Sequence, residues 1–307
     1  MSTPSPAALR RLAVVLALAL AAGGCSAIRR MAVNSLADSL SASGDVYTSD
    51  DDPELVGDAL PFALKTMETL LAEAPRHRGL LLSTCQGFTQ YAYAFVAFDL
   101  PRLEVEDYRF YREQRDRARR LYLRARDYCF RGLEEVAPGV SGRLRVAPEE
   151  AVDAFAAEHV PLLFWTGSSW GSAIGLGLDQ PELVADAPAI RALLARAMEL
   201  EPAYGRGILH EAMIVIEALP EEMGGSIERA REHYDQVLEL RDGRSPSTWL
   251  RWAETVSVRQ QDREEFERLL NQVLETDPDE VTSERLLTIL ARRRARMLLD
   301  LAADLFI

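Results

Sequence analysis

A helix ending that recurs along the chain restricts the possible fold more than any other feature of the sequence. A short apolar and acidic run leads into a proline in four places, and a fifth copy ends on Asp242 instead: residues 70–75, 133–138, 198–202, 273–278 and 237–242. Proline cannot continue a helix, so each copy marks the end of an amphipathic helix. The pattern therefore predicts a chain built from many helices of similar length.

The spacing of these endings indicates a repeat. The last three are about 36 to 40 residues apart, close to the tetratricopeptide period of about 34 residues. That motif has a small residue, an aromatic residue four positions later and a small or apolar residue three positions after that. Ala230, Tyr234 and Val237 fit it well, and Ile190, Leu194 and Ala197 fit it loosely. Helical hairpins of this kind bury their apolar faces by stacking, so we expect one all-α domain. A generic helical bundle with prolines at its helix ends is the alternative.

Apolar periodicity predicts long helices over 53–74, 79–98 and 107–136. Asp52 before Pro53 is typical of a helix start. In the longest helix one stripe at steps of three and four faces a core: Tyr111, Ala118, Tyr122, Ala125, Cys129 and Gly132. Strands are not expected, because no stretch alternates apolar and polar residues with β-branched enrichment.

The amino terminus carries the features of an export signal. Arg10 and Arg11 precede an apolar run over 12–22, which is too short to span a bilayer. Small residues then lead to Cys25, a pattern that resembles a bacterial lipobox, although Ala22 stands where leucine is commoner. We expect a lipoprotein signal peptide over 1–24, an acylated Cys25 and a flexible leash over 25–52, in which a short helix can form over 31–40. The folded domain then covers 53–307. An ordinary cleaved signal peptide is the alternative.

Charge and compartment limit the partners. Ser26, rather than aspartate, follows the cysteine, which favours the outer membrane, facing the periplasm. Removing residues 1–24 moves the net charge from −13 to −15, so nucleic-acid binding is not expected and the acyl anchor must supply the membrane affinity.

An oxidising compartment permits a disulfide between Cys85 and Cys129, but both also occupy apolar helix positions where buried free thiols are common. The two interpretations stay open here.

Motifs for catalysis are weak. Residues 167–171 (GSSWG) fit the G-x-S-x-G elbow of α/β hydrolases, which needs a strand before the serine. Gly167, Gly171 and Gly175 also recur every four residues, and this spacing favours close packing of a neighbouring helix. His210 and Glu211 begin like H-E-x-x-H, but the second histidine is missing. We therefore expect no enzyme, no cofactor and no metal site, with a serine hydrolase as a remote alternative.

Aromatic residues mixed with polar ones occupy two predicted helices. These residues are either core or the walls of a small-molecule pocket, which needs apolar surface and a few hydrogen-bonding groups. The ligand-binding candidates are Gln86, Gln90, Tyr91, Tyr93, Trp165, Thr166, Ser169 and Trp170.

Four segments in order, 82–95, 164–174, 218–240 and 261–305, resemble the T-component lipoproteins (TatT) associated with TRAP transporters. The resemblance implies a periplasmic, membrane-tethered helical protein that forms a homotrimer. It further implies that the protein partners a TRAP solute-binding protein and passes or holds an apolar organic ligand. A cell-envelope scaffold that uses its repeats to bind only protein is the alternative.

Overall fold

The computed structural model describes residues 33–39 and 44–306, and every regular element within them is helical. This confirms the all-α prediction. The longer helices are α3 (Pro53–Glu73), α4 (Arg78–Tyr91), α6 (Tyr108–Glu134), α9 (Val160–Gly175), α11 (Ala187–Leu200), α12 (Ile208–Glu217), α13 (Ile227–Leu240), α16 (Arg263–Glu275) and α17 (Arg285–Asp300). The shorter α-helices are α2 (Gly44–Thr48), α5 (Leu100–Glu106), α7 (Val140–Arg143), α8 (Pro148–Val152), α10 (Pro181–Val184), α14 (Pro246–Trp252), α15 (Val258–Gln260) and α18 (Ala302–Leu305).

Two helices continue into a π-helical turn, η1 (Ala92–Val96) after α4 and η5 (Ala253–Ser257) after α14. Single 3₁₀ turns connect other elements: η2 (Ala157–His159), η3 (Tyr204–Arg206), η4 (Glu221–Met223) and η6 (Thr282–Glu284).

The helix ends lie where the sequence places them. Asp52 caps α3 by accepting a hydrogen bond from the Leu55 backbone N–H, and all five recurrent endings coincide with the ends of α3, α6, α11, α13 and α16. Helix α13, whose ending lacks the proline, is terminated by a left-handed turn instead. Asp242 and Gly243 adopt left-handed φ angles of 52° and 77°, and the Gly243 N–H donates to the Leu238 carbonyl at 2.7 Å.

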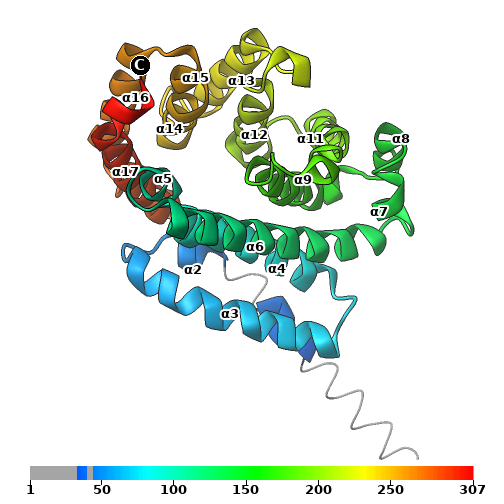
Figure 1. Cartoon of the computed structure of the whole chain (residues 1–307). Coiled ribbons are helices and arrows are strands. Elements are labelled where there is room, and N and C mark those ends of the chain that lie inside the picture. Colours follow the sequence, from blue (N-terminus) through cyan, green and yellow to red (C-terminus); the bar gives the residue numbers. More distant parts are fainter. Residues whose placement is uncertain (1–32, 40–43, 307) are drawn as a thin grey trace, which may run out of the picture.

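Helix α6 crosses the molecule and packs on α4 and on α9 (Figure 1). Its predicted stripe is buried from Ala118 to Gly132, while Tyr111 is half-buried. The small residues let the neighbouring helices approach closely. A side chain added at Gly132, for example, would place its Cβ 2.9 Å from Leu162 of α9.

Cys85 of α4 and Cys129 of α6 form a disulfide, with Cα atoms 5.5 Å apart. Both residues are fully buried in the largest apolar cluster. The structure thus favours the bonded interpretation of the two that the sequence leaves open.

After α9 the chain continues as stacked helices from α11 to α17. Three predicted packing positions of α13 are buried: Ala230, Tyr234 and Val237. The ring centroids of Tyr234 and of Trp252 in α14 lie 4.8 Å apart. A buried carboxylate connects three successive helices of this array through hydrogen bonds. Glu217 of α12, which is 2% exposed, accepts hydrogen bonds from Arg191 of α11 at 2.5 Å and from Arg229 of α13 at 2.8 Å.

The array curves until its last long helix meets the first ones (Figure 1). Val56 of α3 packs with Leu286 and Leu290 of α17 in a buried cluster. Arg293 pairs with Glu54 across this junction, and Arg294 donates to the Phe98 carbonyl. We call this contact the closing junction.

Part of the expected leash belongs to the folded domain. Residues 33–39 are helical, within the predicted 31–40, and Ala37 is fully buried in a cluster with Met67 and Leu71. Helix α2 contacts α17, and Tyr47 packs on the closing junction. Apolar side chains among the serines and aspartates explain the difference, since they gain by burial. The expected signal peptide and Cys25 lie outside the described residues. None of the helices in 33–39 and 44–306 is long and apolar enough to cross a bilayer.

The close approach of α9 to α11 depends on glycine at one position more than at the others. A Cβ at Gly167 would lie 2.9 Å from Leu194, and one at Gly171 would lie 3.6 Å from Ile190. At Gly175 nothing lies within 4 Å. The predicted packing role of the glycines is therefore supported at Gly167. Gly171 would accept a Cβ in ordinary van der Waals contact, and Gly175 faces open space.

We expect Gly167→Ala to lower the free energy of unfolding by about 1–2 kcal/mol, because overpacking outweighs the gain in helix propensity. Gly175→Ala is the matched control and should leave stability unchanged or slightly raised. Urea unfolding followed by circular dichroism measures both. Equal stability of the two variants would contradict the packing role.

Loss of the disulfide should destabilise the protein by about 2–4 kcal/mol, because the bond closes a loop between residues 44 positions apart. The measurement compares thermal unfolding of the wild type and of a Cys85→Ala, Cys129→Ala double variant, with and without reductant. Reductant should lower the melting temperature of the wild type alone.

Candidate functional site

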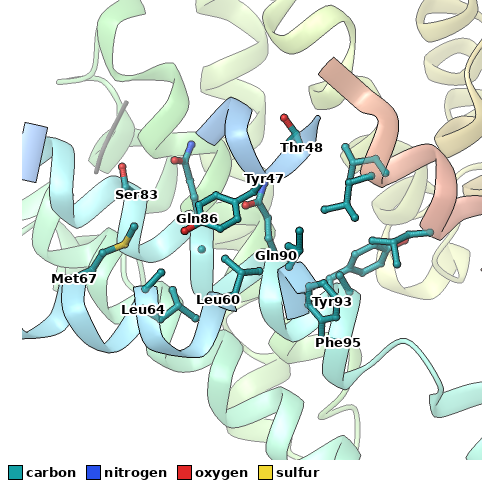
Figure 2. A pocket seen from close by; sticks show the side chains of 17 residues that line it. Tyr47, Thr48, Leu60, Leu64, Met67, Ser83, Gln86, Gln90, Tyr93 and Phe95 are labelled. Atoms are coloured by element: carbon teal, nitrogen blue, oxygen red, sulfur yellow. The ribbon is translucent and has the colours of Figure 1, made fainter. Parts of the chain in front are cut away.

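An apolar pocket lies beside the closing junction, between α2, α3, α4, η1 and α17 (Figure 2). Its cavity volume is about 110 Å³, which approaches the volume of about 150 Å³ of apolar cavities known to bind benzene-sized molecules. Aliphatic and aromatic side chains form most of its wall: Tyr47, Val56, Leu60, Ala63, Leu64, Met67, Tyr93, Ala94, Phe95, Leu286, Leu287 and Leu290.

A few polar side chains interrupt this apolar wall. Gln86 and Gln90 stand one turn apart on α4 and both line the pocket, together with Ser83 and Thr48. Neither glutamine amide forms a side-chain hydrogen bond within residues 33–39 and 44–306. Amides on an apolar wall can orient a ligand that carries a carbonyl, hydroxyl or carboxyl group. Gly87 between them allows the wall to form, because a Cβ there would lie 2.7 Å from Leu64 of α3.

Three of the eight predicted ligand-binding residues line this pocket: Gln86, Gln90 and Tyr93. The other five lie elsewhere in the structure. Thr166, Ser169 and Trp170 are fully buried, and the two hydroxyls donate to backbone carbonyls of their own helix. Trp170 packs edge-on against Phe130.

Trp165 and Tyr91 are half-buried and also make internal contacts. The Trp165 ring packs edge-on against Phe164, and the Tyr91 hydroxyl accepts a hydrogen bond from Arg117. These aromatics are part of the core, which is the first of the two interpretations that the sequence allows.

The catalytic motifs of the sequence do not form catalytic sites. Ser169 lies inside α9 rather than at a strand-to-helix turn, which removes the geometry that a hydrolase elbow requires. Glu211 accepts hydrogen bonds from the hydroxyls of Ser247 at 2.6 Å and Thr248 at 2.8 Å. Within the part of the chain that the structure describes, no three His, Cys, Asp or Glu side chains are placed to hold a metal ion.

Sequence reasoning missed the pocket residues of α2, α3 and α17. Tyr47, Val56, Leu60, Leu286 and Leu290 come from segments more than 200 residues apart, which meet only because the array closes. No local pattern distinguishes them from ordinary apolar helix positions.

A second group of polar residues adjoins the pocket through Tyr93. The Arg251 guanidinium of α14 lies 5.7 Å from the Tyr93 ring centroid. Burial disfavours its charge, but Tyr93, Glu254 and Glu211 outweigh burial and hold the pKa of Arg251 above its ordinary value. Tyr122 of α6 is also near, and burial raises the pKa of its phenol.

Comparison with known proteins identifies the family of the chain. The family model of the TRAP transporter T-component matches residues 49–306, so the chain belongs to this family of accessory components of TRAP transporters. The chain is also similar to an uncharacterized protein of Treponema pallidum (strain Nichols). The two are 29% identical over 310 residues, which cover 94% of this chain and 95% of the relative. The family is not known for enzymes.

His210 of α12 and His233 of α13 face each other, with their Nδ1 atoms 2.9 Å apart. One nitrogen must donate and the other must accept, so the contact needs at least one neutral ring. Burial lowers the pKa of both residues, and the neighbouring His233 lowers the pKa of His210 further.

We expect the protein to lose stability as the pH falls below about 6.5. The unfolded chain binds protons at that pH, whereas the folded chain binds them only at the lowered pKa values. His233→Phe removes one of the two groups and should reduce the loss between pH 7.5 and 5.5. Urea unfolding at both pH values measures it, and an unchanged loss in the variant would contradict the role of the pair.

Proposed function

We propose that this chain is a membrane-tethered periplasmic accessory protein of a TRAP-type transport system. In this proposal it binds the solute-binding protein of that system and holds a small apolar organic ligand. The observation that carries the proposal is the apolar pocket at the closing junction of a chain that belongs to the T-component family. A pocket with a largely aliphatic wall and two glutamine amides suits a ligand with an apolar body and one polar end.

The compartment is part of the proposal. Acylation of Cys25 would anchor the protein, and the disulfide between Cys85 and Cys129 is consistent with an oxidising environment such as the periplasm. The favoured membrane is the outer one, because Ser26 follows the cysteine. Labelling with a radioactive fatty acid, lost in Cys25→Ser, tests the anchor.

Membership of the T-component family supports a proposal for the partner and the assembly. We propose that the acidic helical array binds the solute-binding protein and that the chain assembles as a homotrimer. Copurification with the solute-binding protein of the same transport system tests the first point, and light scattering of the purified protein tests the second. A protein that binds this partner but no small molecule would instead be a scaffold.

The pocket can be tested by filling it. Ala63 of α3 lines the pocket and Ala59, one turn earlier, is exposed outside it. We expect Ala63→Phe to lower the amount of copurified ligand at least about fivefold, because the ring occupies the cavity, while Ala59→Phe leaves it unchanged. Native mass spectrometry measures the bound fraction. If the wild type carries no ligand, or both variants retain it equally, the pocket is not the ligand site.

A further inference from the structure

The Arg251 side chain lies near two acids that form no ion pair with it. No carboxylate in the described ranges forms an ion pair with Arg251. The two nearby acids are already engaged. Glu254 pairs with Arg294 at 2.6 Å, and Glu211 accepts hydrogen bonds from Ser247 and Thr248. A half-buried guanidinium without a carboxylate partner retains the capacity to bind one.

The surroundings of Arg251 come from several helices. Tyr93 belongs to η1, Tyr122 to α6, Glu211 to α12 and Glu254 to η5, and all four are near enough to affect its charge. Both π-helical turns of the described chain therefore contribute to this one place, η1 through Tyr93 and η5 through Glu254. Such turns interrupt an α-helix at a cost in regularity, and they occur frequently at functional sites.

Tyr93 connects this group to the apolar pocket. The residue is 39% exposed and lines the pocket, and Arg251 lies near its ring. In Figure 2, Met67 and Ser83 lie at one end of the row of lining side chains, and Tyr93 and Phe95 lie toward the other. A ligand that extends along the pocket toward Tyr93 thus has a cation next to that end.

We propose that Arg251 binds the carboxylate of an aliphatic monocarboxylic acid whose alkyl chain occupies the apolar pocket. The planar guanidinium matches a carboxylate in two parallel hydrogen bonds. An arginine without an ion-pair partner among the described residues, beside an aliphatic wall, suits a ligand with a single negative charge and a hydrocarbon body. This inference specifies the ligand class and rests on the proposed ligand-binding function.

The test compares octanoate with octanamide, which has the same chain and no charge, by calorimetric titration of the purified protein. We expect octanoate to bind about tenfold to a hundredfold more tightly, as hydrogen bonds to a charged group predict. Arg251→Gln should remove this preference. Arg251→Lys keeps the charge without the planar fork and should show an intermediate preference.

Arg112→Gln is the matched control. Arg112 is exposed on α6 and does not line the pocket, and its replacement changes the net charge by the same amount. The wild-type preference should persist in this variant. Equal binding of octanoate and octanamide to the wild type, no binding of either, or an undiminished preference in a folded Arg251→Gln variant would overturn the inference.

Binding of the solute-binding protein is measured in parallel and separates the two proposals. If that partner binds while octanoate shows no preference, the carboxylate site is wrong and the accessory role stands. If octanoate binds through Arg251 while the partner does not, the site stands and the accessory role fails.

Discussion

The rest of the structure depends on the narrow buried face of α6. Alanine, cysteine and glycine on that face let α4 and α9 both pack against one helix. Larger residues there would separate the two neighbours, and the disulfide could not form, since its Cα atoms must lie within about 7 Å of each other. Because α4 carries Gln86, Gln90 and the turn with Tyr93, the same face also fixes one wall of the pocket.

Two groups of polar side chains differ in this protein, those hydrogen-bonded inside the array and those near the pocket that lack such a partner among the described residues. The buried carboxylates of Glu217 and Glu211 are surrounded by donors from neighbouring helices, so they join layers of the array rather than offering reactive groups. By contrast, the two pocket glutamines form no side-chain hydrogen bond and Arg251 forms no ion pair among the described residues, and Arg251 lies beside Tyr93 of the pocket wall. This contrast separates residues that hold the array together from residues that can meet a ligand.

Much of the fold could be predicted from the sequence because it is encoded locally. The cap at Asp52, the prolines after the repeated endings and the stripe on α6 each depend on residues within a few turns of one another. The site could be predicted only in part. Gln86, Gln90 and Tyr93 belong to one stretch of mixed polarity, but periodicity does not show which face of α9 is covered. Thr166, Ser169 and Trp170 therefore looked like wall residues and proved to be core.

The residues of α2 and α17 could not be predicted as site residues, because their role exists only after the ends of the array meet. That meeting has a further consequence. Open helical arrays need special terminal repeats with a polar outer face, or they expose apolar surface on which further copies could stack. Here α3 and α17 cover each other at Val56, Leu286 and Leu290, so each terminal helix serves as the cap of the other. A repeat added or removed between them would therefore disturb this contact between α3 and α17.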